Sequence, residues 1–77
     1  MTKLSQSMQM RLLDIINEID GPHGHLTLED VEFIHIQGEV VKQIKMISAY
    51  DTSDYMMLFV TTTRDSFSVT VTERRSG

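Results

Sequence analysis

The apolar residues between positions 4 and 19 recur at intervals of three and four, which is the spacing of one face of an α-helix. Polar and charged residues occupy most of the remaining positions. Thr2 or Ser5 is suited to cap the start of this helix. Gly21 and Pro22 mark its end, because glycine accepts the left-handed conformation after a last turn and proline cannot continue a helix. The pattern predicts an amphipathic helix over residues 4–19.

From residue 31 onward, β-branched and aromatic residues replace the helical spacing. The stretch 40–50 also fits a helix face, but the short link at Gly38-Glu39 favours a β-hairpin with the preceding stretch. Polar or glycine-containing turns separate the apolar stretches. We therefore expect four strands, over residues 31–37, 40–50, 55–64 and 67–74.

The segment that joins the helix to the first strand, residues 20–30, is predicted to be a loop. Thr27 and Asp30 have the spacing of a capping box, so a short helical turn at residues 28–31 is an alternative for part of it. Together these elements predict an α+β fold in one small domain over residues 1–77. In this fold, an N-terminal amphipathic helix packs on a four-stranded antiparallel meander sheet.

The last two strands predict which side chains share a face of the sheet. A two-residue turn at Asp65-Ser66 would place Arg64 opposite Phe67 and Val60 opposite Val71. A slip by one residue would mix polar with apolar positions on both faces. The face suited to the helix then gathers Met56, Leu58, Val60, Phe67, Val69 and Val71.

The opposite face also carries apolar residues, and one helix cannot cover both faces. A helix is about 10 Å across, whereas four strands spaced about 4.8 Å apart form a sheet roughly 19 Å wide. A strand that is buried on both faces reads as a continuous apolar run, as residues 55–60 do. We therefore predict that another copy of the chain or a partner protein covers this face, through Ile34, Ile36, Tyr55, Met57 and Phe59.

The chain length strengthens this expectation. Domains as short as 77 residues usually need disulfides, a metal or a partner subunit for stability. The chain has no cysteine, which excludes disulfides, thiolate metal sites and a cysteine nucleophile. Self-association or a protein partner remains, and no cofactor is expected.

The formal net charge of −4 disfavours binding to a phosphate backbone. Residues 1–39 carry seven acidic and two basic side chains, and only Arg74-Arg75 suggests a basic cluster. A nucleic-acid-associated small barrel, with Tyr55 and Phe59 stacking on bases, is therefore the weaker alternative.

Two histidines in the loop raise a second alternative. His23 and His25, near Asp20 and Glu29, are of the types that bind zinc or nickel, but no third ligand has a fixed spacing. A polar turn is the favoured interpretation, so no metal site is predicted. His35 is expected to be a hydrogen-bonded or half-exposed strand residue.

No catalytic motif is present in the sequence. There is no nucleophile elbow, phosphate-binding loop or dinucleotide fingerprint, and Asp51 and Asp54 lie in an expected turn. The apolar run 56–60 is too short to span a bilayer, and residues 1–7 lack an apolar signal region, so a cytoplasmic location is expected. The sequence thus predicts a small non-enzymatic regulatory protein, inhibitor-like or adaptor-like, that binds a protein partner or forms a homodimer through its apolar sheet face.

Overall fold

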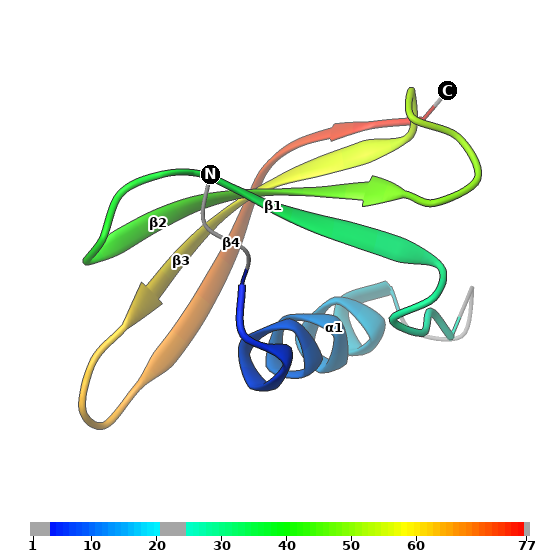
Figure 1. Ribbon diagram of the computed structural model, residues 1–77. Helices are drawn as coiled ribbons and strands as arrows, with labels where there is room; N and C mark the ends of the chain where they lie inside the picture. The colour runs from blue at the N-terminus through cyan, green and yellow to red at the C-terminus, as the bar shows by residue number, and fades with distance from the viewer. Residues whose placement is uncertain (1–3, 21–24, 77) are drawn as a thin grey trace.

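The chain folds into one helix and a four-stranded sheet, as the hydrophobic pattern predicts (Figure 1). The computed structural model describes residues 4–20 and 25–76, without the side chain of Asp20. The α+β class and the N-terminal position of the helix are confirmed. The elements are α1 (Gln6–Asp20), β1 (Val31–Gln37), β2 (Val41–Ser48), β3 (Tyr55–Thr62) and β4 (Phe67–Arg75).

The strands form an antiparallel meander in the order β1-β2-β3-β4, so the sheet is open and β1 and β4 are its edges. Within the ambiguous stretch 40–50, residues 41–48 form strand β2, which pairs with β1 on one side and with β3 on the other. The link between β1 and β2 contains Gly38, whose φ of +91° is unfavourable for other residues. A Cβ atom at Gly38 would also collide with the backbone oxygen of Val41.

The predicted register between β3 and β4 is wrong by two residues. Val60 lies opposite Val69 rather than Val71. The loop is one residue earlier than expected, since the Thr63 N–H donates to the Ser66 carbonyl at 2.8 Å and the Thr63 hydroxyl accepts from the Ser66 N–H at 3.0 Å. These hydroxyl contacts close the hairpin around Arg64 and Asp65. Because a shift of two residues keeps every side chain on its face, the predicted faces stand from Leu58 to Thr62 and from Phe67 to Val71. The ladder is irregular at Thr72, since Met57 lies opposite Glu73 while Leu58 lies opposite Val71.

The helix begins later than the apolar spacing suggests. The Ser5 hydroxyl accepts a hydrogen bond from the Met8 N–H at 3.2 Å, which makes Ser5 the N-cap and places the first helical residue at Gln6. Thr2, the other predicted cap, lies outside the described residues. Among the described residues, no helix is long and apolar enough to cross a membrane.

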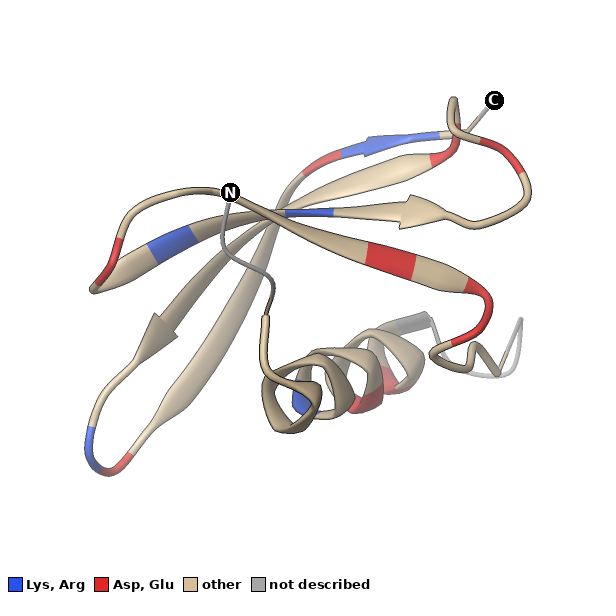
Figure 2. Ribbon diagram, in the orientation of Figure 1, with Lys and Arg blue, Asp and Glu red and all other residues tan. Residues whose placement is uncertain are grey.

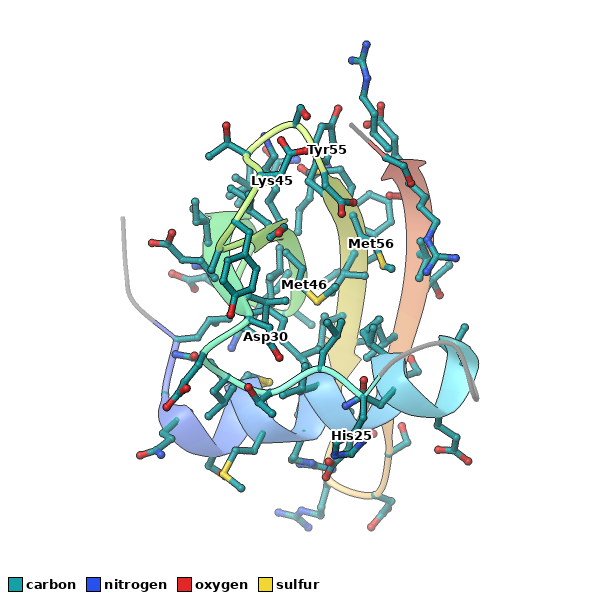
Figure 3. The ribbon with its side chains drawn as sticks, turned by 90° about the vertical axis from the view of Figure 1, so that its right-hand side faces the viewer. His25, Asp30, Lys45, Met46, Tyr55 and Met56 are labelled. Atoms are coloured by element: carbon teal, nitrogen blue, oxygen red, sulfur yellow. The ribbon has the colours of Figure 1, made fainter. Side chains whose placement is uncertain are left out.

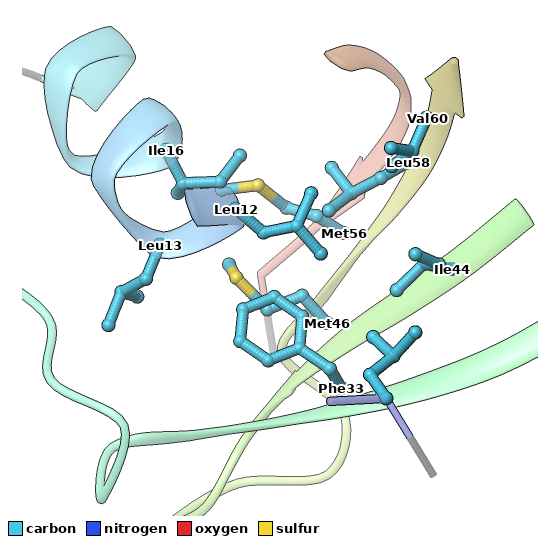
Figure 4. Packing of buried hydrophobic residues seen from close by; sticks show 10 residues of the cluster. Leu12, Leu13, Ile16, Phe33, Ile44, Met46, Met56, Leu58 and Val60 are labelled. Atoms are coloured by element: carbon cyan, nitrogen blue, oxygen red, sulfur yellow. The ribbon is translucent and has the colours of Figure 1, made fainter. Parts of the chain in front are cut away.

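The hydrophobic core lies between α1 and the inner face of the sheet, which is the face that α1 covers (Figures 1 and 4). The helix contributes side chains one and two turns apart, and β2 and β3 contribute alternate residues, as a pleated strand requires. The buried residues are Leu4, Leu12, Leu13, Ile16, Phe33, Ile44, Met46, Met56, Leu58 and Val60.

The segment between α1 and β1 is tied to the helix by one side chain. The Asn17 side-chain amide donates to the Leu26 carbonyl and accepts from the Leu26 N–H, both at 2.9 Å. Residues 28–30 then form a turn, in which the Asp30 carboxylate accepts from the Thr27 N–H at 2.7 Å and from the Thr27 hydroxyl at 3.0 Å. The chain enters β1 directly after this turn, so the predicted capping-box spacing closes a turn and no helix follows it.

Candidate functional site

The outer face of the sheet, which α1 does not cover, carries the predicted binding residues (Figure 1). Side chains alternate between faces along each strand, so the neighbours of the buried core residues point outward. Tyr55, Met57 and Phe59 on β3 lie on this face. The strand pairing places Ile47 of β2 beside Tyr55, and Ile34 of β1 in the same row as Met57. We call the following set the outer strip: Ile34, Ile47, Tyr55, Met57 and Phe59.

The register sets the neighbours of the outer strip. Tyr55 lies opposite Ile47 on β2, and Phe59 lies between Gln43 and Thr70. Phe59 keeps 40% of its surface exposed, whereas the adjacent Leu58 is 0% exposed. Leu58 is thus buried and Phe59 is exposed although they are successive residues of β3, because α1 covers only the inner face of the sheet.

Lys45 lies within the outer strip, between Ile34 on β1 and Met57 on β3. Its ammonium group lies 4.3 Å from the centre of the Tyr55 ring, and the two side chains are neighbours in Figure 3. The aliphatic stem of a lysine covers apolar surface while its charged end stays in water. Lys45 therefore shields part of the outer strip and orders the Tyr55 ring by a cation–π contact.

Charged side chains of both signs surround the apolar residues of the outer strip. Glu32 lies opposite Ile47, and Glu73 lies opposite Met57 at the other side of the sheet. The Tyr55 hydroxyl points to the Glu73 carboxylate at 3.5 Å, and Arg75 lies opposite Tyr55. The face therefore mixes apolar side chains with charges of both signs, and Lys45 lies among the apolar residues themselves.

Ile36, the remaining predicted binding residue, has a different position. It lies at the irregularity in the β1–β2 ladder between His35 and Gln37, and it has no partner residue on β2. Its side chain is exposed. Ile36 therefore lies at the margin of the sheet and is not one of the register neighbours of Phe59.

Two residues that the sequence analysis did not single out belong to this face. Ile47 and Lys45 alternate with the buried Met46 and Ile44 along β2. Polar and apolar residues alternate from residue 43 to residue 46, and this alternation could have assigned Lys45 and Ile47 to the outer face. It could be used only if the stretch was a strand, and the sequence also allowed a helix. The structure resolves that choice and brings both residues beside β3.

Asp51 and Asp54, the two turn residues that resembled a paired-carboxylate site, have structural hydrogen bonds. Asp51 accepts from the Ser53 hydroxyl at 2.6 Å and from the Ser53 N–H at 3.0 Å, and these hydrogen bonds lower the pKa of Asp51. The Asp54 N–H donates to the Asp51 carbonyl at 3.0 Å, so both residues close the turn between β2 and β3. This agrees with the turn predicted for them.

Asp30 joins three segments at one end of the sheet. In addition to Thr27, its carboxylate accepts from the Tyr50 hydroxyl at 3.0 Å, and its backbone carbonyl accepts from the Ala49 N–H at 2.8 Å. The hydrogen bonds from Thr27 lower the pKa of Asp30 most, followed by that from Tyr50. The same contact raises the pKa of Tyr50. This cluster fastens the start of β1 to the turn after β2.

The histidines occupy separate places. The Nε2 atom of His35 lies 3.1 Å from the Gln37 carbonyl oxygen and 2.7 Å from that of Gly38, so the Nε2–H donates a hydrogen bond to the hairpin backbone. His25 is exposed, and His23 lies outside the described residues. Across residues 4–20 and 25–76, no group of three or more His, Asp or Glu side chains is arranged to hold a metal ion.

Comparisons with known proteins give no relative from which a function can be transferred: no family model, no curated protein and no solved structure matches the chain. The function must therefore be argued from the geometry of the outer face.

Proposed function

We propose that this chain is a small non-enzymatic regulatory domain, inhibitor-like or adaptor-like, which binds another protein through the outer strip. The observation that carries the proposal is the exposure of Phe59, on the same side of β3 as Tyr55 and Met57, on a face that the chain's own helix leaves uncovered. Tyrosine, phenylalanine and methionine are enriched at protein interfaces. The predicted cytoplasmic location stays a prediction.

The charge pattern favours a protein over a nucleic acid as the partner. In Figure 2, acidic and basic residues are scattered over the helix, the strands and the loops, and the basic run on β4 is only the two residues Arg74-Arg75. On the outer face, Glu32 and Glu73 would repel a phosphate backbone, and the Lys45 ammonium is already placed over the Tyr55 ring. The open sheet also differs from the barrel of the nucleic-acid alternative. The partner that fits is a flat apolar protein surface with charges of both signs at its rim.

The test compares two variants that place the same charge on exposed apolar residues. Phe59→Asp alters the outer strip, and Met10→Asp alters an exposed position of α1 with similar exposure, 52% against 40%. Proteins captured by each tagged chain are identified by mass spectrometry, and each captured protein is then purified and titrated against the native chain and both variants. We expect Phe59→Asp to weaken binding at least about tenfold, as loss of a central aromatic contact does, and Met10→Asp to leave it unchanged.

Folding of both variants is checked first by circular dichroism. A purified partner that binds native chain and Phe59→Asp equally would contradict the proposal. Capture that disappears after nuclease treatment would assign the outer strip to nucleic acid instead.

A further inference from the structure

A cavity lies at one end of the inner face, between the start of α1 and the β1–β2 hairpin. It has a volume of about 450 Å³ and is partly open to solvent. Leu4 and Met8 line it on the helix side, and His35, Glu39 and Lys42 line it on the hairpin side. Small-molecule sites in proteins have volumes of about 300–1,000 Å³ and combine apolar walls with a few polar groups. The cavity therefore has the size and the lining of a site for a small ligand.

Lys42 brings a positive charge to this cavity. It lies two residues before the fully buried Ile44 and opposite the fully buried Val60, so its side chain belongs to the inner face. The side chain is half-buried, and among the residues that the structure describes its ammonium group has no hydrogen-bond or ion-pair partner. Because removing a charge from water costs free energy unless the charge is paired, this ammonium group favours an anionic ligand.

The other walls set the shape of such a ligand. The side chains of Leu4 and Met8 belong to the hydrophobic core or pack against it, and they give the cavity an apolar wall. The His35 ring is held in place on the hairpin side, because its Nε2–H donates to the backbone carbonyls of Gln37 and Gly38. A ligand with one anionic end and a short apolar tail matches these walls.

The charges of the lining favour a carboxylate over a phosphate as the anionic end. Among the described residues that line the cavity, Lys42 carries a positive charge and Glu39 a negative one. One ammonium group neutralises a singly charged carboxylate, whereas a doubly charged phosphate would keep an excess charge beside Glu39. The Glu39 side chain is exposed, so water and salt screen its repulsion of the ligand.

We propose that this cavity binds a small carboxylate with a short apolar tail, of about the size of hexanoate. The carboxylate pairs with the Lys42 ammonium, and the tail lies against Leu4 and Met8. The site goes beyond the proposed function, because it lies on the inner face of the sheet and the outer strip lies on the opposite face.

The test follows the backbone amide signals of the native chain by two-dimensional NMR while hexanoate is added. We expect the signals of Leu4, Met8 and Lys42 to shift and to saturate with a Kd of about 1 mM, as is usual for a ligand of so few atoms. Acetate lacks the tail and hexanol lacks the charge, so each should bind at least about tenfold more weakly than hexanoate.

Two lysines of β2 provide matched variants. Lys42→Met removes the ammonium group from the cavity and should weaken hexanoate binding at least about tenfold. Lys45→Met makes the same change on the outer face, where the ammonium group lies over the Tyr55 ring, and should leave hexanoate binding unchanged. Glu39→Gln, in the exposed link between β1 and β2, should strengthen binding about twofold because it removes a like charge. This third variant tests the site even if circular dichroism shows that Lys42→Met does not fold.

Other results would overturn the proposal. Signals that do not saturate up to about 20 mM hexanoate would show that there is no such site. Hexanol that binds as tightly as hexanoate would show that the cavity does not select the charge, and hexylamine that binds more tightly would show that it selects a cation. Equal weakening by Lys42→Met and Lys45→Met, or weaker binding by Glu39→Gln, would also contradict the assigned role of Lys42.

Phe59→Asp separates this proposal from the proposed function. It alters the outer strip and should bind hexanoate as the native chain does, whereas Lys42→Met should bind the protein partner as the native chain does. Loss of hexanoate binding in Phe59→Asp would place the carboxylate site on the outer face and overturn the proposal.

Discussion

The two faces of the sheet are built from the same strands but have different surroundings. On the inner face, Ile44, Leu58 and Val60 are completely buried beneath α1. On the outer face, Phe59 and Val41 keep 40% and 51% of their surface exposed. Since successive residues of a strand point to opposite sides, both faces are encoded in one alternating run.

The difference separates the residues that stabilise this small fold from those that the proposed partner would contact. The inner face has only apolar residues at its buried positions, and among the described residues no polar or charged side chain is buried. The outer face mixes aromatic rings with charges such as Lys45 and Glu73. Substitutions on the inner face should therefore change folding, and those on the outer face should change binding.

The largest expected effect comes from comparing two adjacent residues of β3. Leu58→Ala removes a fully buried side chain and should lower the free energy of unfolding by about 2–5 kcal/mol, which is much of the stability of a domain this small. Phe59→Ala should lower it by less than Leu58→Ala does, because 40% of the Phe59 surface is already exposed to water. Urea unfolding followed by circular dichroism measures both values. Equal losses would show that the outer face is also part of the folding core.

A smaller loss of stability is expected at the contact between α1 and the loop that follows it. Asn17→Ala removes both hydrogen bonds to Leu26 and should lower the free energy of unfolding by about 1–3 kcal/mol. Glu18→Ala, at the exposed neighbouring position of α1, serves as the control and should change it by less than about 0.5 kcal/mol. Thermal unfolding of the two variants measures the difference. If both variants melt alike, the connection to Leu26 does not hold the loop on the helix.

Acid should weaken the cluster at the end of the sheet by a further, smaller amount. The pKa of Asp30 is lowered in the folded chain, so its contribution to stability is complete above the ordinary aspartate pKa of about 3.9 and is lost as the pH falls through the lower folded value. The raised pKa of Tyr50 has the opposite sign: its contribution is complete below about pH 10 and is lost as the pH rises further.

The measurement compares the native chain with Asp30→Asn in urea between pH 2 and pH 7, values that bracket about 3.9. We expect the native chain to be the more stable at neutral pH and the difference to shrink below about pH 4. Tyr50→Phe is the matched variant for the alkaline side. A difference that is constant with pH would mean that the charge of Asp30 is not what fastens this corner.

The sequence predicted the faces of the sheet better than its pairing details. Alternation placed Leu58 inward and Phe59 outward, and this required no knowledge of the turns. The turn between β3 and β4 depended on side-chain hydrogen bonds of Thr63 with Ser66, which hydrophobic patterning does not encode. The register was therefore wrong by two residues although the faces were right.

The candidate site shows the same limit. Tyr55, Met57 and Phe59 were identifiable from the continuous apolar run of β3. Lys45 and Ile47 became part of the outer face only through the pairing of β2 with β3. Lys45 pairs with Met57, which is 12 positions away in the sequence, and Ile47 pairs with Tyr55, which is 8 positions away. Long-range pairs of this kind follow from the register and not from local composition.

The smallest expected effect on folding comes from Lys45→Met on β2, and Met46→Lys at the adjacent position provides the contrast. Lys45→Met keeps the length of the stem but removes the charge within the outer strip, so it should change the free energy of unfolding by less than about 1 kcal/mol, the size of an exposed cation–π contact. It should nevertheless raise the fluorescence of a hydrophobic dye, because Ile34 and Met57 are then joined across β2 by a third apolar side chain. Met46→Lys, one residue along, would bury a charge at a position that is 5% exposed and should abolish cooperative unfolding. If Lys45→Met unfolds the chain instead, Lys45 is needed for the fold itself and the separation of the two faces is incomplete.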